Sequence, residues 1–265
     1  KYGDVYVNDA FGTSHRKHAS IQKIQEFFPN KSYMGFLLEK EVSELKKIQK
    51  SSLTPQTVIV GGSKIGSKIH MLKTFLNKAD NILIGGGMAF PFIKYMGGQI
   101  GGSLCNNDEL EVVKKFLIQS EKSATKIVLP IDCIVTDNIS LKTNIKSCDI
   151  MSIPAGYMGV DIGLNSVQLF QKFITNSKLI LWNGPMGIFE TQEFSSGTKA
   201  ITNAIAEFTA SSGYSLIGGG DTVSAISEFS KKSQFSYIST GGGAMLDFFR
   251  NQNLPGILDL KTIIR

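Results

Sequence analysis

Short, almost continuously apolar runs recur along most of the chain, and each is followed by glycines and then by a helical pattern. Runs of this kind are typical of strands buried on both faces, because a half-exposed strand alternates apolar and polar side chains. They predict strands at 57–60, 81–84, 126–129, 178–182, 214–217 and 235–239. Helical patterns predict crossover helices at 64–78, 87–96, 108–121, 165–175, 198–210 and 221–230. This alternation predicts an α/β fold: a doubly wound, Rossmann-like parallel sheet of about six strands.

The part of the chain before residue 50 has a different pattern. Leu38, Val42, Leu45 and Ile48 form one apolar stripe with charged residues opposite, which predicts a single amphipathic helix. Residues 1–36 contain one strand-like run and a loop, which is too little to bury a core alone. We therefore expect residues 1–36 to be part of a second domain.

Composition permits a packed globular domain and disfavours several classes of protein. Hydrophobic residues make up 42% of the 265 residues, yet no apolar run reaches the roughly 18 residues that a membrane helix needs. The formal charge is +6, but lysines are scattered among acids, and no stripe of arginines and aromatics indicates a nucleic-acid binder. Cys105, Cys133 and Cys148 form no C-x-x-C pair and have no zinc-type spacing with the histidines. We expect reduced thiols in the cytoplasm and small phosphorylated ligands, without nucleic-acid or membrane partners.

Glycines follow five of the predicted strands, at 61–62, 85–87, 184 with 187, 218–220 and 241–243. Tight geometry explains any one of these turns, because glycine has no Cβ. A second explanation is that bare backbone N–H groups at helix N-termini bind phosphate. Because the carboxyl ends of parallel strands meet at one edge of a sheet, we expect the turns to line one crevice.

The first turn, GGSKIGSK at 61–68, is similar to a phosphate loop without matching one. A Walker motif ends in Lys followed by Ser or Thr, whereas here Ser67 precedes Lys68. Lys64 and Lys68 are expected on one face of the helix that opens there, where they form either a solvated surface or a phosphate site. No G-x-G-x-x-G motif follows a strand, which disfavours an NAD-dependent dehydrogenase.

The pentapeptide LIGGG occurs at 83–87, followed by Met88, and again at 216–220, followed by Asp221. An exposed helix terminus stabilises an anion by only about 0.3–1 kcal/mol. A millimolar ligand needs about 4 kcal/mol, so glycine turns alone do not hold a nucleotide. Asp221 is either a helix N-cap or a ligand for Mg²⁺, which takes one or two carboxylates and completes its shell with phosphate oxygens and water. The sequence leaves both hypotheses open.

Seven stretches resemble, in order, the motifs of phosphoglycerate kinase. They are DVYVNDAFGTSHRKHAS at 4–20, GGSKIGSKI at 61–69, LIGGGMAF at 83–90, MGVDIG at 158–163, LWNGPMGIFE at 181–190, GGGDT at 218–222 and STGGGA at 239–244. The resemblance implies a two-domain glycolytic phosphotransferase. Its reaction would be reversible transfer of a phosphoryl group between 1,3-bisphosphoglycerate and MgADP, giving 3-phosphoglycerate and MgATP, with Mg²⁺ as cofactor.

The resemblance also implies roles for individual residues. Lys64 would contact the phosphoryl group in transfer, with Gly220 and Gly243 as further catalytic positions, and Asp221 would hold Mg²⁺. Nucleotide contacts would come from Gly62, Lys68, Gly86, Gly87, Leu104, Gly159, Val160, Asn183, Glu190, Gly219, Gly220, Asp221 and Thr222. Glycerate-side contacts would come from His15, Arg16, Gly241 and Gly242. Without the resemblance, Glu190 and Arg16 would be interpreted as surface residues; Trp182 is expected in the core.

A domain division follows from the same resemblance. Residues 1–36 would be a remnant of the N-terminal, phosphoglycerate-binding domain, 37–50 the interdomain helix, 51–240 the nucleotide-binding domain, and 241–265 a hinge-side turn and a tail. Most of the family's first domain has no counterpart here, and Ser67 stands where many members carry Asp. We therefore expect this chain alone to be catalytically incomplete. The alternative hypothesis is a non-catalytic ATP/ADP-binding module.

Overall fold

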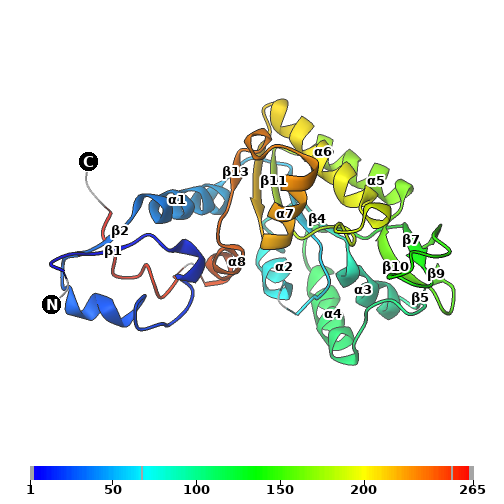
Figure 1. The fold of residues 1–265 in the computed structure, drawn as a ribbon, viewed down its shortest axis with the longest axis horizontal. Coiled ribbons are helices and arrows are strands. Elements are labelled where there is room, and N and C mark those ends of the chain that lie inside the picture. The colour runs from blue at the N-terminus through cyan, green and yellow to red at the C-terminus, as the bar shows by residue number, and fades with distance from the viewer. Residues whose placement is uncertain (1–2, 67, 252, 263–265) are drawn as a thin grey trace. The chain divides into compact units, whose positions relative to one another are not determined.

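The computed structural model describes residues 3–66, 68–251 and 253–262 (Figure 1). The chain divides into two compact units. The larger unit comprises Leu53–Ile217 and Asp221–Ile238, and the smaller unit comprises Lys1–Ser52, Gly218–Gly220 and Ser239–Arg265.

A six-stranded parallel sheet forms the centre of the larger unit, in the order β13-β12-β11-β3-β4-β6. The strands are β3 (Gln56–Val60), β4 (Asn81–Ile84), β6 (Lys126–Val128), β11 (Leu179–Asn183), β12 (Tyr214–Gly218) and β13 (Tyr237–Ile238). Every residue of β3 and β11 is buried, as expected for continuously apolar strands covered on both faces. The predicted α/β fold with about six parallel strands is confirmed.

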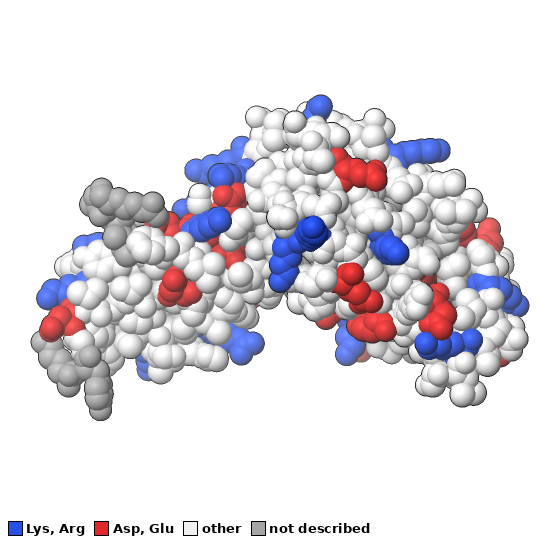
Figure 2. All heavy atoms as spheres, turned by 45° about the horizontal axis from the view of Figure 1, so that its top comes forward, with Lys and Arg blue, Asp and Glu red and all other residues white. Residues whose placement is uncertain are grey.

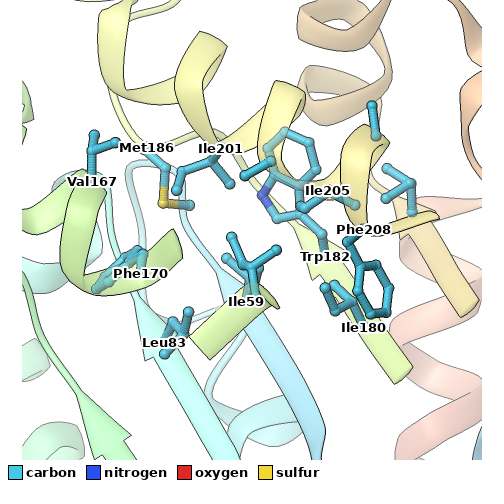
Figure 3. Close-up of a cluster of buried hydrophobic side chains, with 14 of the residues drawn as sticks. Ile59, Leu83, Val167, Phe170, Ile180, Trp182, Met186, Ile201, Ile205 and Phe208 are labelled. Carbon is cyan, nitrogen blue, oxygen red and sulfur yellow. The ribbon is translucent and has the colours of Figure 1, made fainter. Parts of the chain in front are cut away.

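Helices α5 (Leu164–Thr175) and α6 (Ser196–Ala210) pack against one face of this sheet (Figure 1). Ile59 of β3, Leu83 of β4 and Trp182 of β11 lie in one cluster with apolar residues of these helices (Figure 3). Trp182 is fully buried, as predicted, and its indole Nε1 donates a hydrogen bond to the carbonyl oxygen of Gly184, 2.8 Å away. The core thus fixes the turn that follows β11.

The other helices of the larger unit differ in part from the predicted ranges. The α-helices α4 (Asn107–Ser120) and α7 (Gly220–Phe229) lie close to their predicted positions. The predicted helix 64–78 corresponds to α2 (Ile69–Phe75), which is shorter at both ends. The predicted helix 87–96 begins as a 3₁₀ turn, η3 (Gly87–Ala89), and continues as α3 (Phe90–Tyr95). Pro91 stands in the first turn of α3, where its missing N–H leaves no hydrogen bond unmade.

A small antiparallel sheet was not predicted from the sequence. It has the order β10-β7-β8 and consists of β7 (Asp132–Thr136), β8 (Lys146–Asp149) and β10 (Met158–Ile162). Two further short strands, β5 (Gln99–Ile100) and β9 (Ser152–Ile153), pair in parallel. These strands are short and mix polar and glycine residues with apolar ones, so their pattern is weaker than that of the central sheet. They enclose a separate apolar cluster around Phe90 and Val135.

The smaller unit contains the predicted amphipathic helix as α1 (Phe36–Lys50), whose stripe residues are all buried. Its other elements are β1 (Tyr6–Asn8), which pairs in parallel with β2 (Ser32–Met34), the 3₁₀ turns η1 (Phe11–Thr13) and η2 (Lys23–Phe27), and α8 (Gly242–Asn251). Helix α8 was not predicted, because its N-terminal glycines conceal the helical spacing of the buried residues Ala244, Met245, Phe248 and Phe249.

The surface view in Figure 2 shows lysines and arginines interspersed with acidic residues on the visible face. This distribution agrees with the predicted solvated surface. In the part of the chain that the structure describes, no helix combines the length and apolar character needed to span a membrane.

Candidate functional site

The larger unit has a pocket of about 260 Å³ beside the carboxyl ends of β3, β4 and β11. Parallel sheets of this type place ligands at this edge. Eight of the predicted site residues line the pocket: Gly62, Gly86, Gly87, Leu104, Gly159, Val160, Glu190 and Asp221. They come from six separate parts of the sequence, and the structure brings them together as the switch-point argument predicted.

Gly86 shows why the turn after β4 requires glycine. Its φ is +64° with ψ −164°, a region that residues with a Cβ rarely occupy. A Cβ at this position would also lie 2.6 Å from the backbone nitrogen of Gly62. The turns after β3 and β4 can therefore approach closely only because Gly86 has no side chain. Their bare backbone faces the pocket.

Alanine at Gly86 is expected to lower the free energy of unfolding by about 1–3 kcal/mol, because the backbone there is strained for any L side chain. Gly66→Ala is the matched control, since a Cβ at Gly66 would meet no atom of the described residues within 4 Å, and Gly66 has no positive φ. Urea unfolding of both variants measures the difference. Equal stability of the two variants would show that the Gly86 turn can relax.

The apolar side of the pocket is built by the small antiparallel sheet. The pairing of β10 with β7 shifts its register between Gly159 and Asp161, so Val160 is the bulged residue, and it is buried against the pocket. Bulges of this kind re-aim side chains beside sites. A Cβ at Gly159 would overlap the ring of Phe90, and the Gly159 N–H donates to Ser103 Oγ at 2.9 Å. This side of the pocket is apolar, and the bare backbone of Gly159 faces the ring of Phe90.

Lys68 lies at the polar side of the site, behind Gly62. Its Nζ donates hydrogen bonds to the carbonyl oxygens of Gly61 at 2.5 Å and Asn183 at 3.2 Å, at the ends of β3 and β11. Burial lowers the pKa of Lys68 to about 8, and the carboxylate of Asp221 acts in the opposite direction. The ammonium therefore remains largely protonated at neutral pH and places a positive charge at the sheet edge.

Lys64 is exposed in the loop before α2 and does not share a helical face with Lys68, so that expectation was wrong. The reason is Ile65, which is fully buried and whose carbonyl oxygen accepts the N–H groups of both Lys68 and Ile69. This turn delays the start of the helix to Ile69. Ser67 lies outside the described residues.

Asp221 is exposed in the first turn of α7 and lines the pocket. The helix begins at Gly220, so Asp221 is not at the N-cap position, and within the described residues its carboxylate accepts no hydrogen bond. Thr222, the next residue, is buried and accepts a hydrogen bond from the Gly184 N–H at 2.6 Å. The geometry leaves the Asp221 carboxylate uncommitted and favours the ligand hypothesis over the cap.

Asn183 is buried at the end of β11, and its Nδ2 has no hydrogen-bond partner among the described residues. Buried polar groups are normally paired, so this donor is available to a ligand or water. The described residues contain no group of three or more His, Cys, Asp or Glu side chains that could hold a metal ion. A cation bound here would need ligands from the bound molecule itself.

The remaining predicted residues lie in the smaller unit. There the turn before α8 packs against the turn before α7: a Cβ at Gly242 would lie 2.8 Å from Gly219 Cα and 3.6 Å from the nitrogen of Gly220. Gly241 packs against Phe11 of η1, and Gly243 lies near the imidazole of His15. Arg16 is exposed next to His15.

Comparison with known proteins decides the family. A family model described as phosphoglycerate kinase matches residues 1–252. The chain belongs to the phosphoglycerate kinase family. The resemblance inferred from the seven motifs is thereby confirmed.

Individual phosphoglycerate kinases match over nearly the whole of this chain. The protein named phosphoglycerate kinase from Thermosipho africanus is 45% identical over 98% of this chain, and that from Pseudothermotoga lettingae is 44% identical over 96%. The solved structure of phosphoglycerate kinase from Coxiella burnetii covers 96% of the chain at 37% identity with a TM-score of 0.89. The chain spans only 64% and 63% of the length of the two curated relatives, and 64% of that solved chain.

Two residues that shape this pocket were missed from the sequence. Asp161 lines the pocket and is buried; its carboxylate accepts the N–H of Gly197, at the start of α6, at 2.6 Å. Burial raises the pKa of Asp161 to about 7, against the effect of its backbone hydrogen bonds. Thr198 Oγ1 accepts the N–H groups of Met186 and Gly187, which fixes the loop after β11. Asp161 lies inside the quoted MGVDIG motif, so an acid between apolar strand residues was the available signal.

Proposed function

We propose that this chain is the nucleotide-binding part of a phosphotransferase that moves a phosphoryl group between 1,3-bisphosphoglycerate and MgADP, giving 3-phosphoglycerate and MgATP. The observation that carries the proposal is the pocket of the larger unit, where an apolar slot, bare glycine turns and an uncommitted carboxylate meet, with the half-buried Lys68 behind the turn at Gly62. The names of the relatives support the reaction.

Each part of the pocket matches one part of a nucleotide. The slot beside Gly159, Val160 and Leu104 suits a flat base, and Glu190 at the rim suits ribose hydroxyls. Lys68 and the donor of Asn183 suit phosphate oxygens, and Thr222 fixes the turn at Gly184. Phosphoryl transfer depends mainly on positioning and charge neutralisation, so this donor set needs no covalent nucleophile.

Asp221 would hold Mg²⁺ together with phosphate oxygens of the nucleotide, because Mg²⁺ is commonly bound through one or two carboxylates plus phosphates and water. When bound, the metal neutralises charge on the phosphates. Lys64 is exposed in its loop, where its flexible side chain could neutralise the group in transfer. Gly219 and Gly220 would contact the nucleotide, and Gly220 and Gly243 would also face the transferring group. His15, Arg16, Gly241 and Gly242 would serve the glycerate side.

The finer assignments belong to the same proposal. We assign 1–36 to a remnant of the phosphoglycerate-binding domain, 37–50 to the interdomain helix, 51–240 to the nucleotide-binding domain and 241–265 to the hinge-side turn and tail. We place the protein in cytoplasmic glycolysis as a monomer, without nucleic-acid or membrane partners. The mixed surface charge supports this assignment.

The second candidate, a non-catalytic ATP/ADP-binding module, is favoured by one observation: every residue that lines the pocket belongs to the larger unit. Calorimetry with MgADP, beside a coupled assay with 3-phosphoglycerate and MgATP, tests both candidates. We expect saturable MgADP binding with little or no turnover by this chain alone. Turnover at normal enzymatic rates would contradict both the expectation that this chain alone is catalytically incomplete and the hypothesis of a non-catalytic module. Absence of MgADP binding would contradict both candidates.

A further inference from the structure

Two cysteines face each other in the small antiparallel sheet. Cys133 of β7 is directly opposite Cys148 of β8 in the pairing register, and their Sγ atoms lie 3.8 Å apart. Both thiols are free. This pair could not be predicted from the sequence, because fifteen positions separate the two residues and the strands that align them were not predicted.

The backbone geometry suits a disulfide between them. Residues directly opposite on antiparallel strands have Cα atoms about 4.5 or 5.5 Å apart, and both values fall in the range of about 4.4–6.8 Å found for disulfides. Their side chains also lie on the same face of the sheet. The third cysteine, Cys105, packs against the same apolar cluster, but its thiol contacts the carbonyl oxygen of Asn106.

Access to the two thiols differs. Cys148 is partly exposed on β8, which is an edge strand, between the exposed residues Ser147 and Asp149. Cys133 is only 1% exposed. A small molecule can therefore reach Cys148 first, and Cys133 can react only with its neighbour. This order favours a bridge within the chain over two separate adducts.

We propose that Cys133 and Cys148 are a redox modification site that closes to a reversible disulfide by exchange with a low-molecular-weight disulfide. The Cys148 thiolate attacks one sulfur of the small disulfide, whose S–S bond breaks and releases one thiolate. Cys133 then attacks Cys148 Sγ and displaces the second thiolate, which takes the Cys133 proton as it leaves. The two cysteines are oxidised, and the small disulfide is reduced to two thiols.

The modification site adjoins the pocket. Cys133 lines it, and its neighbour on the other side is Ile162 of β10, the strand that carries Gly159 and Val160. Closing the bridge draws Cys133 toward β8 and away from β10. We expect the bridge to weaken MgADP binding by about fivefold, within the range of typical site–site coupling. This coupling, but not the bridge itself, rests on the proposed nucleotide function.

The bridge is tested by incubating the full chain with oxidised glutathione, followed by intact mass and peptide mapping. We expect the chain to become lighter by two hydrogen atoms, with Cys133 linked to Cys148, and dithiothreitol to reverse the change. Cys105→Ser should behave in the same way. Cys133→Ala should instead keep one glutathionyl group on Cys148. A stable adduct on wild-type Cys148, a link to Cys105, or no change in mass would each overturn the proposal.

The coupling is tested by MgADP calorimetry on the oxidised and reduced forms of Cys105→Ser, in which no third thiol interferes. Weaker binding by the oxidised form supports the coupling. Equal affinities, with the bridge confirmed by mass, would overturn the coupling and leave the modification site. If neither form binds MgADP, the proposed function fails together with the coupling, while the mass result still stands.

Discussion

Alanine at Asp221 is expected to weaken MgADP binding by about tenfold or more, while metal-free ADP binds as well as before or better. The carboxylate lines the pocket, is exposed, and accepts no hydrogen bond from the described residues, so it is available to the cation proposed above. Loss of a charged metal ligand removes at least about 1.4 kcal/mol, which is tenfold in affinity. Without metal, the same carboxylate only repels phosphate. Calorimetry with ADP, with and without Mg²⁺, measures the contrast.

Asp108→Ala is the matched control for this prediction. Asp108 also lies in the first turn of a helix, α4, and is exposed, but it does not line the pocket. It should leave both affinities unchanged. If Asp221→Ala weakened ADP and MgADP binding equally, Asp221 would act only through the charge of its helix terminus, which contributes about 0.3–1 kcal/mol.

The residues that follow the two copies of LIGGG lie in different environments. Met88, after the first copy, is fully buried in η3, whereas Asp221, after the second copy, is exposed. The difference between the two residues therefore includes a local reason: one packs in the core and the other faces solvent. Met88→Asp would bury a carboxylate, so its effect would be loss of stability and not a test of metal binding.

The central sheet could be predicted because its signal is local. Strands such as β3 and β11 are buried over their whole length, so the apolar runs alone define them. The stripe of α1 follows from the same kind of signal. The antiparallel sheet depends on pairing between distant segments, such as Cys133 with Cys148, and its strands contain glycine and charged residues that dilute the pattern.

The candidate site was predictable only in part for the same reason. The glycine turns follow strands and could be placed at one edge of the sheet from the topology rule. The contacts that hold those turns could not, because they join distant positions: Thr222 to Gly184, and Lys68 to Asn183. The loop before α2 could not be predicted either. The buried residue Ile65 forms a turn there, although the spacing of the two lysines predicted a helix.

Lys68 should make the stability of the larger unit rise with pH above 8. Its pKa is about 8 in the folded chain and 10.5 in the unfolded chain, because burial disfavours the ammonium. Between these values the unfolded chain binds more protons, so its free energy relative to the folded chain rises with pH. The full rise attributable to Lys68 is about 3 kcal/mol, complete near pH 10.5. Below pH 8 Lys68 is charged in both the folded and the unfolded chain, so burying the ammonium lowers the free energy of unfolding by its full amount.

Lys68→Met isolates this contribution, since tyrosines, cysteines and other lysines titrate in the same range. The free energy of unfolding is measured with urea at pH 7.5 and pH 10. The difference between the wild-type value and the Lys68→Met value should shift in favour of the wild type as the pH rises. Lys78→Met, which removes an exposed lysine beyond α2, should keep the wild-type slope. A parallel rise in wild type and Lys68→Met would show that the ammonium is well solvated. The positive charge at the edge of the sheet would then carry no desolvation penalty. The burial of Lys68 would therefore not strengthen its binding of phosphate.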